Sequence, residues 1–287
     1  MKLFDISGKI DNYRLEIIAS VKEACDELRI PFFIVGATAR DIILEYIYNI
    51  KVHRATNDID FGIMIDNWNT FNALTSFLLK NKKYSLDKLI EHRLLFEKSY
   101  PLDIVPFGKI SSSDGTFKWP KENNKFTVIG FEEAYNNSKI VKVQNNPDLI
   151  INFATAESLC LLKIISWSER YPDRSKDAID IVFLIESYIN AGNLERLMDK
   201  ELDLVDKDFD YVLAGARLLG RDISANFNKR SLEFVLKILD NETGVQRRYR
   251  LVEDMRQSKI IKEDLDFDYY LDIIEKLKTG IKERMNI

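Results

Sequence analysis

Two aspartates, Asp58 and Asp60, stand one residue apart in the otherwise apolar stretch "DIDFGIMI". The residues of this stretch alternate with the period of two that is typical of a β-strand, so both aspartates are expected on one face, about 7 Å apart. The opposite face is expected to carry Ile59, Phe61, Ile63 and Ile65. Carboxylates this close repel each other unless a cation lies between them. Mg²⁺ prefers such oxygen ligands and commonly takes one or two protein carboxylates together with water and substrate phosphates. The pair therefore predicts a magnesium site.

A third aspartate, Asp103, lies between Leu102 and Ile104 in the apolar segment "LDIVPFG". A third carboxylate near the first two would allow a second ion to bind, as two-metal nucleotidyl transfer requires. We therefore expect all three aspartates to be metal ligands and catalytic residues. An alternative stays open, in which Asp58 pairs with Arg54 and the third aspartate pairs with a lysine at a solvated strand edge.

The stretch before these aspartates offers a place for phosphate groups. An apolar strand, "PFFIV", runs directly into Gly36, Ala37 and Thr38, which open an amphipathic helix expected over residues 38–48. Backbone N–H groups at a helix start, together with a threonine hydroxyl, can donate hydrogen bonds to phosphate. Such junctions are also common as simple turns. Arg40, in the first turn, is expected either to contact the nucleotide or to pair with an aspartate.

A second group of charged residues follows in the later half of the chain. Lys163 and Arg170 are seven residues apart in a helical pattern, so they are expected on one helix face, where they could bind a triphosphate. Asp177 and Asp180 share a face of the next helix. Asp177 is expected to orient Lys163 or to deprotonate the attacking hydroxyl, and Asp180 to be structural. The alternative is that both basic side chains extend from a surface helix into solvent.

The apolar periodicity predicts an α+β fold. The first half alternates helices and strands, which points to a mixed sheet with flanking helices over residues 1–150, and the second half, 151–287, is helical. In the first half, helices are expected over 11–29, 38–48 and 68–80, and strands over 31–35, 58–65, 93–99 and 101–107. The first two helices of the second half would then complete the active site.

Composition excludes several classes of protein. The 287 residues are 46% hydrophobic and 31% charged, with a net charge of -4, which gives no global attraction to nucleic acid. No apolar run approaches the roughly 20 residues needed to span a bilayer, and the N-terminal stretch does not resemble a secretory signal, so we expect a cytoplasmic protein without membrane contact. Cys25 and Cys160 are expected to be buried thiols. Only His53 and His92 are available for histidine chemistry, and His53 is expected at the surface.

The order of these motifs resembles the nucleotidyltransferase superfamily typified by DNA polymerase beta, and within it the AbiEii/AbiGii toxin-type nucleotidyltransferases. Members combine strand, Gly-x-Thr, helix and Asp-x-Asp strand with a later lysine helix and an Arg/Lys-Asp-x-x-Asp segment. The residues in register with that later part are Lys163, Arg170, Lys176, Asp177 and Asp180. The resemblance spans roughly residues 30 to 190. It implies an enzyme that uses Mg²⁺ and transfers a nucleoside monophosphate from an NTP.

Three functions follow as hypotheses. The resemblance implies a toxin of a toxin–antitoxin or phage-defence pair, with a protein antitoxin and an RNA acceptor such as tRNA. The second hypothesis is a nucleotidyltransferase with a small-molecule acceptor, and the third is a catalytically silent member that binds a protein. The basic cluster "RRYR" (Arg247, Arg248, Arg250), with Tyr249 for stacking, favours a nucleic-acid acceptor. A solvated helix face explains the cluster almost as well.

Overall fold

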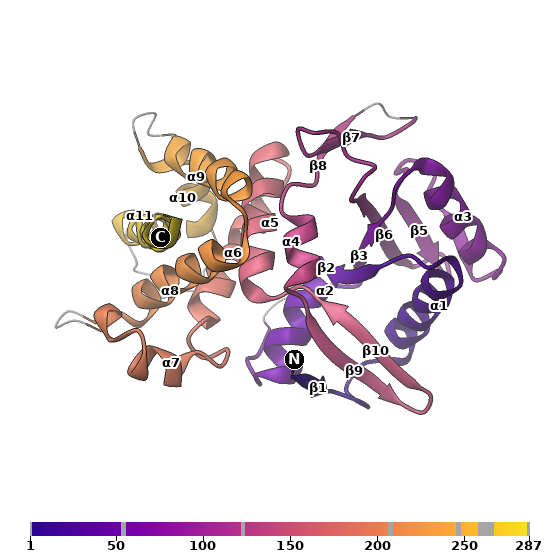
Figure 1. Ribbon diagram of the computed structural model, residues 1–287, viewed down its shortest axis with the longest axis horizontal. Helices are drawn as coiled ribbons and strands as arrows, with labels where there is room; N and C mark the ends of the chain where they lie inside the picture. Colours follow the sequence, from indigo (N-terminus) through magenta and orange to yellow (C-terminus); the bar gives the residue numbers. More distant parts are fainter. Residues whose placement is uncertain are drawn as a thin grey trace. The chain divides into compact units, whose positions relative to one another are not determined.

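Figure 1 shows the computed structural model. It describes residues 2–52, 56–121, 124–205, 209–244, 248–257 and 267–285. The chain divides into two compact units, Met1–Thr155 and Ala156–Ile287. The first unit combines a mixed sheet with helices and the second is helical, so the predicted α+β class is confirmed. None of the helices in the described part of the chain combines the length and the apolar character that crossing a membrane requires.

The first unit is built on a mixed sheet whose eight strands, among the described residues, lie in the order β1-β9-β10-β2-β3-β6-β5-β4. A separate hairpin pairs β7 with β8. The strands are β1 Leu3–Asp5, β2 Phe32–Val35, β3 Ile59–Met64, β4 Tyr84–Leu86, β5 Arg93–Phe96, β6 Tyr100–Phe107, β7 Thr116–Lys118, β8 Lys125–Thr127, β9 Lys139–Asn145 and β10 Asp148–Phe153. The predicted strands correspond to β2, β3, β5 and β6, which are neighbours in the centre and one side of the sheet.

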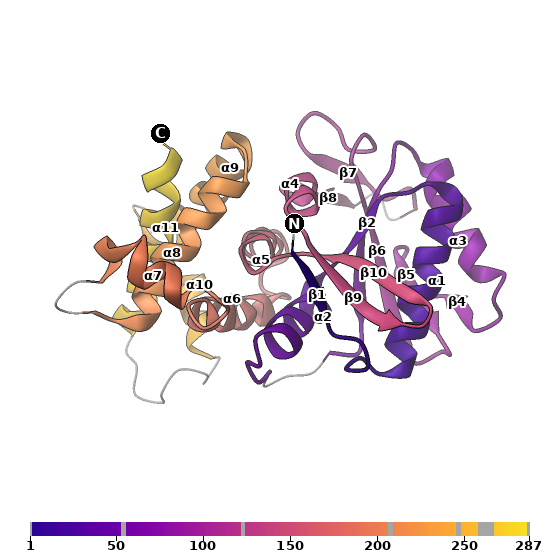
Figure 2. The same cartoon turned by 60° about the horizontal axis from the view of Figure 1, so that its bottom comes forward.

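The helices of the first unit are α1 Asn12–Leu28, α2 Gly36–Asp41, α3 Trp68–Leu79 and α4 Phe131–Asn136. Two of them, α1 and α3, lie side by side (Figure 2). Helix α2 continues into a π-helical segment, η1, over Ile42–Ile47. The helix predicted over 38–48 thus starts earlier, because the left-handed backbone of Gly36 (φ +69°) lets β2 turn directly into α2 without a loop.

The register of the sheet places four residues in one row across neighbouring strands. Val35 on β2 pairs with Asp60 on β3, Asp60 pairs with Asp103 on β6, and Asp103 pairs with Arg93 on β5. Paired residues of neighbouring strands point to the same face of a sheet, so the two carboxylates and the guanidinium share a face. The opposite face of β3 carries Ile59, Phe61 and Ile63, each fully buried as predicted.

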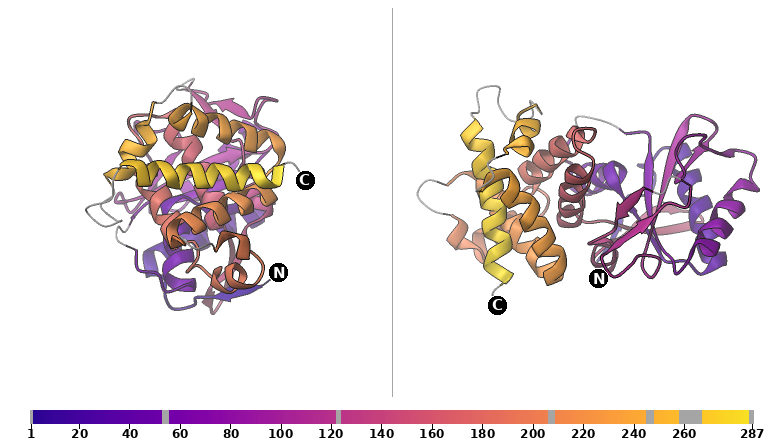
Figure 3. Two further views of the ribbon diagram at one scale, coloured as in Figure 1. Left: turned by 90° about the vertical axis from the view of Figure 1, so that its left-hand side faces the viewer. Right: turned by 90° about the horizontal axis from the view of Figure 1, so that it is seen from above.

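The second unit is an assembly of helices. These are α5 Ala156–Glu169, α6 Ser175–Ser187, α7 Leu194–Asp199, α8 Tyr211–Asn226, α9 Lys229–Thr243, α10 Arg250–Arg256 and α11 Phe267–Met285, with a 3₁₀ turn, η2, at Leu202–Leu204. Helix α11 lies between α8 and α9 (Figure 3). A Cβ atom added to Gly280 would lie 2.0 Å from the carbonyl oxygen of Arg217, and one added to Gly220 would lie 2.3 Å from that of Leu277. The close packing of α8 on α11 therefore depends on both glycines.

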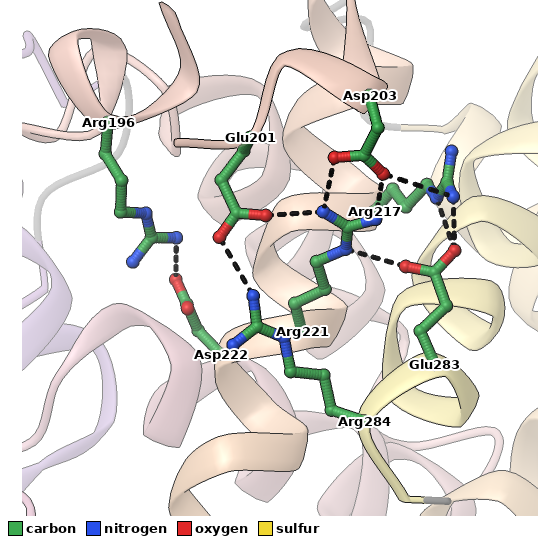
Figure 4. Close-up of polar contacts among 8 residues, drawn as sticks. All are labelled: Arg196, Glu201, Asp203, Arg217, Arg221, Asp222, Glu283 and Arg284. Carbon is green, nitrogen blue, oxygen red and sulfur yellow. Dashed lines mark hydrogen bonds and ion pairs between the residues drawn. The ribbon is translucent and has the colours of Figure 1, made fainter. Parts of the chain in front are cut away.

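A network of ion pairs joins η2, α8 and α11 (Figure 4). Arg221 of α8 is at its centre: Nη1 donates to Glu201, Nη2 to Asp203, and Nε to Glu283 at 2.6 Å. Glu201, which is only 6% exposed, also accepts from Arg284 at 3.1 Å. The pKa of Arg221 is raised, chiefly by its hydrogen bond to Asp203 and also by those to Glu283 and Glu201, so this guanidinium stays charged at any ordinary pH.

The two cysteines are buried in the two units. Cys25 and Cys160 are free thiols, as predicted, and burial raises the pKa of each to about 12.

Candidate active site

The start of α2 lies directly against the Asp60 carboxylate. A Cβ atom added to Gly36 would be 1.8 Å from Asp60 Oδ2, so no other residue fits without moving that side chain. Two residues further on, Thr38 Oγ1 donates a hydrogen bond of 2.6 Å to the carbonyl oxygen of Asp58. Both aspartates of the Asp-x-Asp motif are therefore fixed to the Gly36–Thr38 segment, one by packing and one by a hydrogen bond.

Asp58 lies one residue before β3, where the hydroxyl of Thr56 donates to its Oδ1. Its side chain and that of Asp60 are half-buried, which leaves each partly accessible to an ion. Thr38, whose hydroxyl was predicted to donate to phosphate, is only 2% exposed. Its hydroxyl already donates to the backbone carbonyl oxygen of Asp58. Its observed contact holds the strand to the helix.

Arg40, predicted to contact the nucleotide or an aspartate of the motif, lies against its own neighbour. Its Nε donates to Asp41 Oδ1 at 2.7 Å, and the residue is 2% exposed. Arg54 and His53, the other basic residues considered near this strand, lie outside the described residues.

Asp103 is buried and paired with an arginine. Arg93 Nε donates to Asp103 Oδ1 and Arg93 Nη2 to Oδ2, both at 2.7 Å, in the parallel fork geometry that makes such pairs strong. The pKa of Arg93 is raised, mainly by these hydrogen bonds and also by the charges of Asp103, Asp58 and Asp60. All three predicted aspartates therefore act electrostatically on one guanidinium.

Arg93 and its neighbour His92 were not predicted as site residues. His92 Nε2 lies 3.8 Å from Asp103 Oδ2, and its ring stacks on Trp119 with centroids 5.3 Å apart. A signal was present in "HRLLF", where an arginine begins a strand whose alternate residues, Leu94 and Phe96, are buried. That pattern puts Arg93 on the polar face of β5, but only the pairing of β5 with β6 shows which residue it meets.

Asp58 and Asp60 fit a magnesium ion, and Asp103, the partner of Asp60 on the next strand, is ion-paired with Arg93. Within the described ranges, no three Asp, Glu, His or Cys side chains are grouped so that they could hold a metal ion. Both oxygens of Asp103 accept hydrogen bonds from Arg93. Two carboxylates nevertheless match the usual protein share of a Mg²⁺ shell, which substrate phosphates and water complete. The donor set is therefore suited to an ion that arrives with a nucleotide.

In the second unit, Lys163 is buried between two aspartates of α6. Its Nζ donates to Asp177 Oδ1 at 3.1 Å and to Asp180 Oδ2 at 2.5 Å, and the lysine is 8% exposed. A lysine that extended into solvent from a surface helix would not show this burial. Burial raises the pKa of Asp177, but the charges of Lys163 and Arg174 outweigh it, so its pKa lies below the ordinary value of 3.8.

Arg170 lies at the C-terminal end of the helix that carries Lys163. Helix α5 ends at Glu169, and Arg170 follows it at an exposed position. The Arg170 N–H still donates to the carbonyl oxygen of Ser166, the i to i−4 pattern of a helix. The cationic face shared with Lys163 stays a prediction. Lys176, at the start of α6, is also exposed.

The basic cluster "RRYR" offers less free charge than its sequence suggests. Arg250 is ion-paired through Nη2 with Glu242, which is 1% exposed. The ring of Tyr249 packs edge-on against that of Phe267, with centroids 5.1 Å apart. Arg248 is exposed, and the first arginine of the cluster lies outside the described residues. Of the described members, Arg248 alone is both basic and exposed.

Three features of the first unit are typical of a nucleotidyltransferase. They are a helix that begins at a glycine, an Asp-x-Asp strand packed against that helix, and a third carboxylate on the next strand. Residues 21–272 match the family described as nucleotidyl transferase AbiEii toxin, type IV toxin–antitoxin system. The chain belongs to this family, and it is a nucleotidyltransferase that uses an NTP.

Similarity to solved structures is weaker. ANT(2")-Ia in complex with adenylyl-2"-tobramycin shows 14% identity over 64% of this chain and 99% of that chain, with a TM-score of 0.38. The Thermotoga maritima CCA-adding enzyme complexed with tRNA shows 11% identity over 97% of this chain and 83% of that chain, with a TM-score of 0.27. No curated protein matches.

Proposed function

We propose that the protein transfers a nucleoside monophosphate from an NTP to an acceptor hydroxyl in a magnesium-dependent reaction. The observation that carries this proposal is the contact of the Gly36 backbone with the Asp60 carboxylate, which brings a helix start and a metal-ligand pair together. Asp58 and Asp60 would hold the Mg²⁺. When bound, the ion supplies positive charge to the triphosphate. Backbone N–H groups of the segment that begins at Gly36 would bind the phosphates.

In this reaction the acceptor hydroxyl oxygen forms a bond to the α-phosphorus. The bond from that phosphorus to the bridging oxygen of the β-phosphate breaks, pyrophosphate leaves with the bonding electrons, and the hydroxyl loses its proton. Lys163 would neutralise the leaving pyrophosphate. Asp177 would hold Lys163 in place, since a carboxylate with a lowered pKa is a weak base for the hydroxyl proton.

Residues 1–150 would form the catalytic domain, and the first two helices of the helical domain 151–287, α5 and α6, would contribute Lys163 and Asp177. Arg170 is exposed and would contact the triphosphate. Arg40 would act on the nucleotide only after leaving Asp41.

The acceptor we propose is an RNA, such as tRNA, and the biological role is that of a toxin controlled by a protein antitoxin. An RNA supplies the hydroxyl nucleophile that the reaction needs, and a toxin must modify a component that a growing cell requires. The exposed Arg248 is available for contact with an RNA phosphate.

The test is incubation of the protein with each α-³²P-labelled NTP, Mg²⁺ and total RNA. We expect label in RNA with the wild type and none with Asp60→Ala. Asp66→Ala is the matched control, because Asp66 follows β3 and its side chain is 62% exposed. Equal labelling by Asp60→Ala would refute the metal assignment. Label that appears only in added small molecules, such as aminoglycosides, would replace the RNA acceptor with a small-molecule acceptor.

A further inference from the structure

We propose that Arg93 binds the acceptor, and that the acceptor carries negative charge next to its hydroxyl, as the end of an RNA does. The inference rests on the proposed nucleotidyl transfer and deepens it. It assigns the NTP and the acceptor to opposite ends of one row of residues, and it names the charge of the acceptor.

The row across the sheet has a direction. Strands β2, β3, β6 and β5 are neighbours in this order. Gly36, which directly follows β2, lies against Asp60 of β3. Asp60 pairs with Asp103 of β6, and Asp103 pairs with Arg93 of β5. The helix start and Arg93 are therefore at opposite ends of the row, and the backbone of Arg93 is two strand spacings, roughly 10 Å, from that of Asp60.

The NTP belongs at the glycine end of this row. Its phosphates would bind backbone N–H groups of the segment that begins at Gly36 and an ion held by Asp58 and Asp60. The attacking and leaving oxygens of phosphoryl transfer lie roughly in line on opposite sides of the phosphorus. Because pyrophosphate leaves on the glycine side, the acceptor hydroxyl approaches from the other end, where Asp103 is paired with Arg93.

Arg93 can bind a second anion while it holds Asp103. Its Nε and Nη2 each donate to one oxygen of Asp103 at 2.7 Å, and the N–H groups of Nη1 lie outside this pair. The Arg93 side chain is 24% exposed, against 10% for the side chain of Asp103. A guanidinium carries five N–H donors in a planar fork and binds phosphate as it binds carboxylate. Arg93 can thus donate to an acceptor phosphate while it stays fixed to the sheet.

The charge of Arg93 also selects between acceptors. A guanidinium keeps its positive charge at any physiological pH, so at this end of the row it attracts an anionic acceptor and repels a cationic one. The terminal hydroxyls of an RNA lie next to a phosphodiester, whereas the hydroxyls of an aminoglycoside lie next to ammonium groups. An RNA therefore fits this end of the row better than a cationic small molecule.

The test measures binding of 5′-fluorescein-labelled tRNA, without NTP and over a range of KCl concentrations, to the wild type and to Arg93→Gln. The glutamine amide can still donate to Asp103 but carries no charge. We expect the Kd for tRNA to rise about tenfold and the salt slope to fall by about one counterion, with the Kd for NTP unchanged. Arg29→Gln is the matched control, because Arg29 is exposed and precedes β2, at the end of that strand away from Gly36. It should change neither the Kd for tRNA nor the slope.

A second variant separates charge from geometry. Arg93→Lys keeps the charge and loses the fork, so it should restore the salt slope but only part of the affinity. An unchanged slope in Arg93→Gln, or NTP binding that weakens as much as tRNA binding, would overturn the inference. If Arg93→Gln does not fold, Arg93→Lys decides: a KM for tRNA that rises no more than the KM for NTP would contradict the assignment.

The acceptor itself gives the last outcome. A wild type that labels aminoglycosides and no RNA would overturn the assignment of an anionic acceptor, although nucleotidyl transfer would stand. A wild type that transfers label to no acceptor would instead refute the proposed function, so the two failures are distinguishable.

Discussion

Replacing Gly36 with alanine would displace the Asp60 carboxylate. The new Cβ would lie 1.8 Å from Asp60 Oδ2, whereas ordinary contact begins at 3.4 Å. The carboxylate must therefore move by about 1.6 Å, and a misplacement of about 1 Å in an active site costs on the order of 100-fold in rate. We expect the rate of nucleotidyl transfer to fall at least that far.

The same substitution also strains the backbone, because Gly36 has a φ of +69°. Alanine in the left-handed region costs about 1–2 kcal/mol of stability. Gly8 is a matched control: its φ is +82°, and a Cβ added there would meet nothing within 4 Å. Gly8→Ala should lose about the same stability without moving a catalytic group.

The assay compares transfer of label from NTP with unfolding in urea for both variants. We expect both variants to lose stability and the rate deficit to be confined to Gly36→Ala. A label-transfer rate of Gly36→Ala within threefold of the rate of Gly8→Ala would refute this reasoning. In that case the position of the Asp60 carboxylate is not critical, and the contact between the helix start and the metal-ligand pair does not contribute to catalysis.

Three further predictions concern the second unit. The pKa of Asp177 is lowered in the folded state, so its charge stabilises the fold above about pH 4, and this contribution is lost as the pH falls through the folded pKa. The urea midpoints of the wild type and Asp177→Asn should therefore converge at acid pH. A difference in midpoint that does not vary with pH would contradict the pairing with Lys163. Arg250→Glu places a second carboxylate beside the buried Glu242 and should lower the free energy of unfolding in urea by about 3 kcal/mol. An unchanged midpoint would show that Glu242 does not need Arg250 as its ion-pair partner. Arg221→Met removes the centre of the ion-pair network and should also cost about 3 kcal/mol; a loss below about 1 kcal/mol would show that its partners find other contacts.

The parts of the fold that depend on local pattern could be predicted from the sequence. The alternation in "DIDFGIMI" gave both the strand and its buried face, because side chains in a strand alternate regardless of what the strand pairs with. The end of α5 also had a local signal. Pro172 disfavours a helical conformation at Tyr171, the residue before it, which predicts that the helix ends close to Arg170.

Sheet register had no such local signal. The pairing of Arg93 with Asp103 depends on the antiparallel alignment of β5 with β6, and a shift of one residue would move Arg93 to the other face. At one edge, β1 pairs with β9, and these two strands lie far apart in the chain. Strand β1 has only three residues, too few for a period to be recognised, and its partner is set by the packing of the whole unit.

Burial decides which charged residues of a motif stay available for ligands. A buried charge needs an opposite charge nearby, because desolvation is otherwise too costly. Asp103 and Lys163 are both buried and both meet this need within their own unit, through Arg93 in one case and α6 aspartates in the other. Asp58 and Asp60 are half-buried, and an ion that arrives with substrate can compensate them. The motif thus identifies the residue types of the site, while the partner that each residue finds in the fold determines whether it binds metal, holds another side chain or contacts the nucleotide.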